Sequence, residues 1–135
     1  MDKQILLVDD DTDDHEIFCM ALEELDNCYK CVFAKDGMEA LEMLKNENNL
    51  IPEIIFLDLN MPRMNGIECL PEIKKIHRIN HVPIIIYSTS SDTKIIEKVK
   101  DLGAAEYLVK PSRIEALSET LKQIFKNHLT TQIEK

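Results

Sequence analysis

The sequence predicts an α/β fold, a three-layer sandwich in which five helices cover both faces of a five-stranded parallel sheet. Five short apolar runs with strand character alternate with five segments of helical periodicity along the 135 residues. One helix between consecutive strands is the connection that parallel pairing requires. An apolar content of 44% and a charged content of 30% are typical of a globular chain that buries a core. We therefore expect one domain over residues 1–128 and a frayed tail over 129–135.

The first two expected strands each lead into a helix with a recognisable start. Residues 4–8 (QILLV) form the first strand, and Thr12 is expected to cap the following helix. Residues 29–34 (YKCVFA) form the second strand, and the spacing of Asp36 and Glu39 predicts a capping box for the next helix. The apolar faces of these helices are formed by Ile17, Phe18, Ala21, Leu22 and Leu25, and by Ala40, Leu41 and Leu44.

The third strand is expected over residues 53–58 (EIIFLD), and the helix after it contains a proline. Pro71 falls inside GIECLPEIKKIHR, where a helix-interior proline costs about 3 kcal/mol. Two alternatives follow. The regular helix starts near Leu70, or a distorted turn precedes it.

The last two expected strands span residues 82–88 (VPIIIYS) and 105–110 (AEYLVK). Ser91 is expected to open the helix between them and Gly103 to end it, while Ser112 and Glu115 predict a capping box for the last helix. Continuous apolar runs in the central strands favour the flavodoxin-like strand order 2-1-3-4-5, since a barrel would need eight strands.

Polar side chains follow four of the strands at their carboxyl ends, where open α/β sheets bind ligands. Asp9 and Asp10 end the first strand, Asp58 the third, Ser88 the fourth and Lys110 the fifth. Because the first and third strands are neighbours in the expected order, we expect their three carboxylates to converge. Charges about 4 Å apart repel by roughly 4 kcal/mol at an effective dielectric of about 20, so a cation is expected among them.

Magnesium fits this donor set, because it takes oxygen ligands and uses one or two carboxylates together with a phosphate oxygen. The expected ligands are Asp9, Asp10 and Asp58, with the backbone carbonyl of Asn60 as a further candidate. A carboxylate, a metal, a lysine and a hydroxyl suit phosphoryl transfer, with Asp58 as nucleophile.

The neighbouring residues of the acidic run have a simpler interpretation. Asp11, Asp13 and Asp14 are expected to favour the positive end of a helix dipole, and His15 to be a solvated residue of the first turn. Cys28 and Cys31 form a C-x-x-C pair, but a strand rather than a helix follows them and no further zinc ligands are visible, so no redox or metal role is expected.

Composition also excludes classes of partner. A net charge of −9 repels phosphate backbones, so we expect no nucleic-acid binding. No segment approaches the roughly 20 apolar residues of a membrane span, and the N-terminus is unlike a signal peptide. We therefore expect a cytoplasmic protein with no membrane association.

With these motifs in hand, the chain resembles a bacterial response-regulator receiver domain, of the chemotaxis-regulator-like type used in two-component signalling. The matching stretches are LLVDDD, IIFLDLNMPRMNG, IIIYSTS and AEYLVKPS, and the resemblance covers residues 3–126. The DDDTDD run also resembles the single-domain regulators found beside phytochrome-type kinases.

The resemblance implies a role for each residue at the acidic end of the site. Asp58 would be the phosphorylation site, accepting phosphate from a phosphohistidine of a sensor histidine kinase or a histidine phosphotransfer protein. Asp10 would bind Mg²⁺ directly, Asp9 through water, and Asn60 through its backbone carbonyl.

The resemblance also implies a switch. Ser88 would be the switch hydroxyl, Lys110 the phosphate-pairing lysine in a cis peptide with Pro111, and Tyr107 the switch aromatic. The surface of the fourth helix, fifth strand and fifth helix would then change for a downstream protein target, and a homodimer is possible. The protein would be a stand-alone signalling domain with self-catalysed phosphoryl transfer and dephosphorylation, not an enzyme.

Other functions stay open at this point. A phosphorelay intermediate or a phosphate sink uses the same site. A flavodoxin-like FMN-binding module would need a Ser/Thr/Gly-rich phosphate loop where this chain has carboxylates. A haloacid-dehalogenase-like phosphatase would need an aspartate as general acid at position 60, where this chain has Asn60.

Overall fold

The computed structural model describes residues 3–25, 29–46 and 50–133, with side chains as far as Leu129. Its elements are β1 (Lys3–Val8), α1 (Thr12–Leu25), β2 (Tyr29–Ala34), α2 (Gly37–Asn46), β3 (Ile54–Leu57), α3 (Gly66–Lys74), η1 (His77–Ile79), β4 (Ile84–Ser88), α4 (Thr93–Asp101), β5 (Glu106–Val109) and α5 (Ile114–Ile133). The short 3₁₀-helix η1 was not anticipated. No helix of the described residues is long and apolar enough to cross a lipid bilayer.

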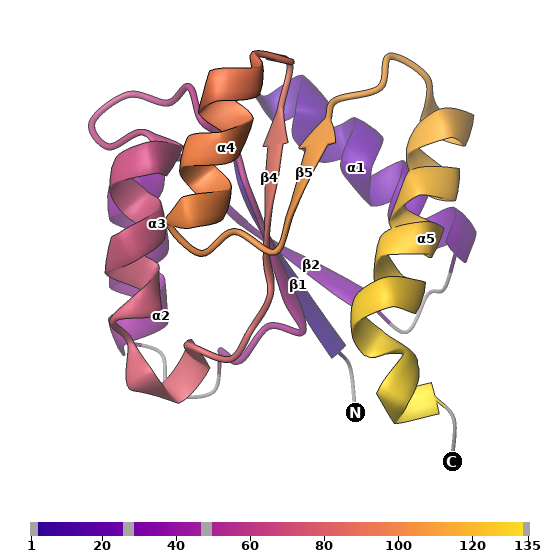
Figure 1. Ribbon diagram of the computed structural model, residues 1–135. Helices are drawn as coiled ribbons and strands as arrows, with labels where there is room; N and C mark the ends of the chain where they lie inside the picture. Colours follow the sequence, from indigo (N-terminus) through magenta and orange to yellow (C-terminus); the bar gives the residue numbers. More distant parts are fainter. Residues whose placement is uncertain (1–2, 26–28, 47–49, 134–135) are drawn as a thin grey trace.

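The five strands form one parallel sheet in the order β2-β1-β3-β4-β5, which confirms the predicted fold class (Figure 1). Strands β3 and β4 are buried throughout and β1 is buried from Ile5 onward, as a sheet covered on both faces requires. Helices α1 and α5 cover one face, and α2, α3 and α4 cover the other.

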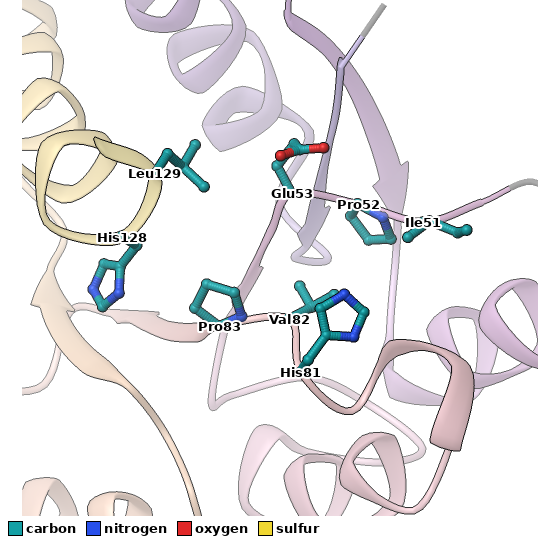
Figure 2. A pocket seen from close by; sticks show the side chains of 8 residues that line it. All are labelled: Ile51, Pro52, Glu53, His81, Val82, Pro83, His128 and Leu129. Carbon is teal, nitrogen blue, oxygen red and sulfur yellow. The ribbon is translucent and has the colours of Figure 1, made fainter. Parts of the chain in front are cut away.

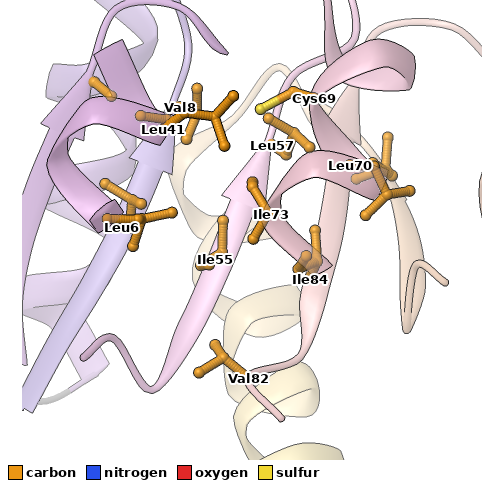
Figure 3. Packing of buried hydrophobic residues seen from close by; sticks show 14 of the residues in the cluster. Leu6, Val8, Leu41, Ile55, Leu57, Cys69, Leu70, Ile73, Val82 and Ile84 are labelled. Carbon is orange, nitrogen blue, oxygen red and sulfur yellow. The ribbon is translucent and has the colours of Figure 1, made fainter. Parts of the chain in front are cut away.

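Alternate residues of each strand supply the two cores. On the α2–α3–α4 side, Leu6, Ile55 and Ile84 pack against the inner faces of the helices (Figure 3). On the opposite face, Phe18 of α1 meets Phe56 and Tyr87 edge to face, with ring centroids 4.9 and 5.8 Å apart. This packing fixes where each strand ends, and so where the polar residues beyond it lie.

Helix α3 resolves the alternatives that Pro71 left open. The helix begins at Gly66, with Pro71 inside it, rather than near Leu70. Its start is stabilised by a capping box, because Asn65 accepts from the Glu68 N–H at 2.9 Å and Glu68 accepts from the Asn65 N–H at 3.1 Å. These bonds and the burial of Leu70 favour a regular first turn in spite of the proline.

Two other helix starts differ by one residue from the expectation. Asp11, not Thr12, accepts from the backbone N–H of Asp13 at 2.9 Å at the start of α1. At the start of α4, Asp92 rather than Ser91 accepts from the Lys94 N–H. In both cases a carboxylate is available beside the hydroxyl, and charged acceptors make the stronger bond.

Nearby, the expected capping box of α2 is confirmed in part and the expected end of α4 in full. Asp36 accepts from the Glu39 N–H at the start of α2, although the Glu39 carboxylate accepts from Lys35 rather than from Asp36. Gly103 ends α4 with a φ of 113°, a conformation that favours glycine.

The C-terminal segment differs from the frayed tail expected over 129–135. Helix α5 continues to Ile133, and Leu129 is only 4% exposed within the core beneath α1 and α5. Leu129 follows Phe125 by four residues and so extends the same apolar face of the helix. Residues 134–135 lie outside the described part of the chain.

Candidate functional site

The backbone ladder of the sheet continues one residue beyond the strands and places the polar side chains at its carboxyl edge. The N–H of Asp9 donates to Ala34 O at 2.9 Å, and the N–H of Asp58 donates to Val8 O at 2.9 Å. At the other side of the site, the N–H of Lys110 donates to Ser88 O at 2.8 Å. The site residues are therefore held by the sheet rather than by flexible loops.

Three carboxylates converge at this edge, as the sequence predicts. Oxygen atoms of Asp9, Asp10 and Asp58 all lie within 4.8 Å of one another. Asp9 and Asp58 are buried, whereas Asp10 is exposed. One oxygen of each buried carboxylate is fixed by a backbone donor, because Asp9 Oδ1 accepts from Asp11 N–H at 3.0 Å and Asp58 Oδ1 from Leu59 N–H at 2.8 Å.

The second oxygens of the buried carboxylates face the ammonium group of Lys110. Lys110 Nζ lies 2.8 Å from Asp9 Oδ2 and 3.3 Å from Asp58 Oδ2, and 5.2 Å from the centre of the Tyr87 ring. Its shortest contact, 2.6 Å, is to Asp14 Oδ2 on the first turn of α1. Asp14 was expected only to favour the helix dipole, and the structure instead makes it part of the site.

The direction of helical side chains is the signal that points to Asp14. Side chains in a helix lean toward its N-terminus, which for α1 lies at the carboxyl edge of the sheet. The side chain of Asp14 therefore points toward the site.

His15 also differs from the expectation that it is solvated. Its ring stacks on Phe33 with centroids 4.5 Å apart, and its Nε2 lies 2.6 Å from Asp9 O. It is half-buried and supports the backbone that carries the acidic pair.

The pKa values of Asp9 and Lys110 are both raised, for different physical reasons. Burial raises the pKa of Asp9 to about 7, although the hydrogen bonds from Lys110 and the Asp11 N–H act in the opposite direction. Burial also opposes the charged form of Lys110. Its hydrogen bonds to Asp14 and Asp9 and the charge of Asp58 outweigh that effect, so the pKa of Lys110 is raised.

The side chains expected to act as a switch, Ser88 and Tyr107, both form hydrogen bonds with the loop that follows β4. Ser88 is fully buried, and its Oγ accepts from the Ser90 N–H at 3.2 Å. Tyr107 is half-buried on β5 and donates its hydroxyl hydrogen to Ser90 O at 2.7 Å. Both side chains thus contact the loop that leaves the site toward α4.

Two further features of the site region bear on the expectations. Asn60 is exposed just beyond β3, one residue from the fixed Leu59 N–H. The described residues contain no cis peptide bond, so Lys110–Pro111 is trans and the expected cis bond is wrong. The trans isomer is the intrinsically favoured form of an X–Pro bond.

One cysteine of the C-x-x-C pair belongs to the described part of the chain. Cys28 falls outside the described residues, and Cys31 is half-buried on β2, where burial raises the pKa of its thiol to about 12. The thiolate is the reactive form of cysteine, and a raised pKa disfavours it.

A separate pocket lies at the opposite edge of the sheet (Figure 2). It is formed between the last turns of α5 and the segments that enter β3 and β4, and it is lined by Ile51, Pro52, Glu53, His81, Val82, Pro83, His128 and Leu129. Of the two lining histidines, His128 is paired with Glu106 at 2.7 Å. This pocket contains none of the residues that end the strands.

The charge balance at the carboxyl edge decides what it can bind. The cluster holds one ammonium group and four carboxylates, so its net charge is −3 when all are ionised. The carboxylates are those of Asp9, Asp10, Asp14 and Asp58. Clustered carboxylate oxygens of this kind fit a hard divalent cation such as Mg²⁺. Asp58 is the buried carboxylate with the longer contact to Lys110, so its Oδ2 is the less tightly held oxygen.

Comparison with known proteins agrees with this chemistry. A family model described as "Response regulator receiver domain" matches residues 5–122. Among curated relatives, the two-component response regulator ORR13 of Oryza sativa subsp. japonica is 33% identical over 120 residues, which cover 89% of this chain and 96% of that protein. The two-component response regulator-like protein APRR9 of Arabidopsis thaliana is 29% identical over 123 residues. These residues cover 91% of this chain but only 26% of that protein.

Solved structures show the same similarity. The phosphorylated cyanobacterial phytochrome response regulator RcpA is 32% identical, with a TM-score of 0.85 and coverage of 97% of this chain and 96% of that one. The Mn²⁺-bound form of response regulator Rcp1 is 28% identical, with a TM-score of 0.80 and coverage of 92% of each chain.

Proposed function

The chain belongs to the response regulator receiver family of two-component signalling, and we propose that Asp58 is the residue that accepts its phosphoryl group. The observation that carries this proposal is the convergence of Asp58, the acidic pair and Lys110 at the carboxyl edge of the sheet. The donor would be a phosphohistidine of a sensor histidine kinase or of a histidine phosphotransfer protein.

In the proposed reaction, Asp58 Oδ2 attacks the phosphorus atom while the phosphorus–nitrogen bond of the phosphohistidine breaks. The imidazole leaves with the bonding electron pair, and an acyl phosphate forms on Asp58. Oδ2 suits this role because its 3.3 Å contact with Lys110 is long, whereas Oδ1 is fixed by the Leu59 N–H at 2.8 Å. Lys110 then pairs with an oxygen of the transferred group.

The proposed Mg²⁺ ligands are the side chains of Asp9, Asp10 and Asp58 and the backbone carbonyl of Asn60. A bound Mg²⁺ would neutralise charge on the phosphoryl oxygens as they approach the carboxylates. The carboxylate spacing supports the assignment, since three oxygen donors lie within 4.8 Å of one another.

The phosphoryl group would shift the protein toward a second conformation. It adds about −1.5 to −2 charge and three strong acceptor oxygens, which favour a conformer in which Ser88 and Lys110 reach it. Reorientation of Ser88 would break its bond with the Ser90 N–H, and Tyr107 would lose its partner Ser90 O as that loop moves. The surface of α4, β5 and α5 is the proposed readout for a downstream protein target or a homodimer.

The wider setting is part of the same proposal. We place the protein in the cytoplasm, as a regulator that catalyses its own phosphoryl transfer and dephosphorylation. A role as a phosphorelay intermediate or phosphate sink would use the same residues.

Labelling with acetyl phosphate and Mg²⁺ tests the assignment. We expect one phosphate per chain, on an acyl phosphate that hydroxylamine releases, and no label in Asp58→Asn. Asp101→Asn, a change of the same type at an exposed position of α4, should label like wild type. Label that persists in Asp58→Asn would show that another residue is the acceptor.

A further inference from the structure

Lys110 divides its hydrogen bonds unequally among three carboxylates. Its ammonium group has three N–H donors, and Nζ lies 2.6 Å from Asp14 Oδ2, 2.8 Å from Asp9 Oδ2 and 3.3 Å from Asp58 Oδ2. The proposed phosphoacceptor therefore has the longest contact, and a residue of α1 has the shortest.

Asp14 is well placed to hold Lys110. Its side chain is 23% exposed and that of Lys110 is 10% exposed, so solvent screens the pair only partly. The neighbouring Asp13 offers an internal comparison. Asp13 is exposed, and its described contact is the bond from its backbone N–H to Asp11 Oδ1.

From this geometry we propose that Asp14 is a positioning residue that competes with the phosphorylated side chain of Asp58 for the ammonium group of Lys110. The inference rests on the proposed function, because it assigns Lys110 to the phosphoryl group. Asp14 draws the ammonium group toward α1, and a phosphoryl group must draw it back toward β3 or share its donors.

The two ligands of the site should respond to Asp14 with opposite signs. The carboxylate adds a negative charge beside the acidic cluster, so it favours a divalent cation. The same charge repels a phosphoryl dianion, and the hydrogen bond from Lys110 to Asp14 withholds a donor that the dianion could use. If Asp14 only stabilised the fold, its replacement would instead lower the affinity for both ligands.

Asp14→Asn tests the proposal, because it removes the charge and keeps the size of the side chain. Mg²⁺ affinity is measured by calorimetry, and the affinity for beryllofluoride, an analogue of the phosphoryl group, is measured at saturating Mg²⁺. We expect Mg²⁺ to bind roughly threefold or more weakly, and beryllofluoride to bind roughly threefold or more tightly, than in wild type.

Asp13→Asn is the matched control, with the same change of charge one residue away, and both its shifts should be clearly smaller. Asp14→Glu keeps the charge and should return both affinities toward wild type. Circular dichroism establishes that each variant is folded.

The results separate the inference from the function on which it rests. If wild type binds beryllofluoride but Asp14→Asn changes both affinities in one direction, or no more than Asp13→Asn does, Asp14 does not compete for Lys110. If wild type itself fails to bind beryllofluoride with Mg²⁺, the proposed function is wrong and the inference is lost with it.

Discussion

Gly66 lies closer to the backbone of the proposed phosphoacceptor than any residue with a side chain can. A Cβ atom at Gly66 would lie 2.4 Å from Asp58 O and 3.0 Å from Leu59 Cα. The first distance is about 1 Å shorter than favourable carbon–oxygen contacts of about 3.3 Å. The Gly66 N–H also donates to Leu59 O at 2.9 Å, which ties the start of α3 to the end of β3.

Gly66→Ala must therefore displace either α3 or the backbone of Asp58 by about 1 Å. Overpacking of this kind costs typically about 1–3 kcal/mol. The better helix propensity of alanine returns up to about 1 kcal/mol. We expect the free energy of unfolding to fall by about 1–2 kcal/mol. A 1 Å misplacement of reacting groups can cost about 100-fold in rate, so labelling by acetyl phosphate should slow by at least about tenfold.

Urea unfolding followed by circular dichroism measures the first effect, and the initial rate of phosphate incorporation at saturating Mg²⁺ measures the second. Gly37→Ala is the matched control. Its Cβ would lie 2.8 Å from Met64 O, a similar clash against the loop before α3 instead of against Asp58. It should lose stability and keep most of the labelling rate. A Gly66→Ala protein with wild-type stability and rate would refute the reasoning.

Three further predictions concern the stability of the fold, each measured by urea unfolding. Asp36→Ala should cost about 1 kcal/mol through the lost helix cap. Asp36→Asn should keep the cap but lose the ion pair with Arg63, whose hydrogen bonds lower the pKa of Asp36. That ion pair stabilises the fold at pH values above the unfolded pKa of Asp36, about 3.9, and its contribution is lost as the pH falls through the lower pKa of the folded state. This acid dependence of stability should be present in wild type and missing in Asp36→Asn. Pro71→Ala should stabilise the protein by up to about 2 kcal/mol, because alanine supplies an N–H that can donate to Ile67 O in α3. An unchanged urea midpoint would mean that the proline causes no strain. Leu129→Ala should cost about 2–4 kcal/mol because Leu129 is buried, whereas a frayed end would show no loss.

The strand order and the acidic cluster were predictable from sequence for one physical reason. Apolar runs with strand character separated by helices leave few arrangements, and a parallel sheet collects the residues after its strands at one edge. Asp9 and Asp58 follow neighbouring strands, so their proximity needs only the strand order. Their role needs more than the fold, because it depends on the chemistry of the bound groups.

The residues that sequence reasoning missed depend on contacts between elements. Asp14 has an adequate local explanation at a helix start, and only the packing of α1 on the face of the sheet that it shares with α5 brings it to Lys110. The capping box of Asn65 and Glu68 was not anticipated, and with it α3 begins at Gly66 in spite of Pro71. Leu129 continues the spacing of Phe125, and its burial follows from the packing of α5.

The geometry around Lys110 also shows how one residue can connect the two parts of the proposed switch. Its ammonium group contacts the acidic cluster, while its backbone N–H donates to Ser88 O at the end of β4. Ser88 and Tyr107 both bind Ser90, so the loop that leaves the site is joined to the half-buried face of β5. In the proposed switch, a new partner for the Lys110 side chain would change the forces at Asp58 and leave the backbone bond to Ser88 in place. The sheet would then stay fixed while the loop and Tyr107 took a second position, and the surface of α4 and β5 would change without a disturbance of the core.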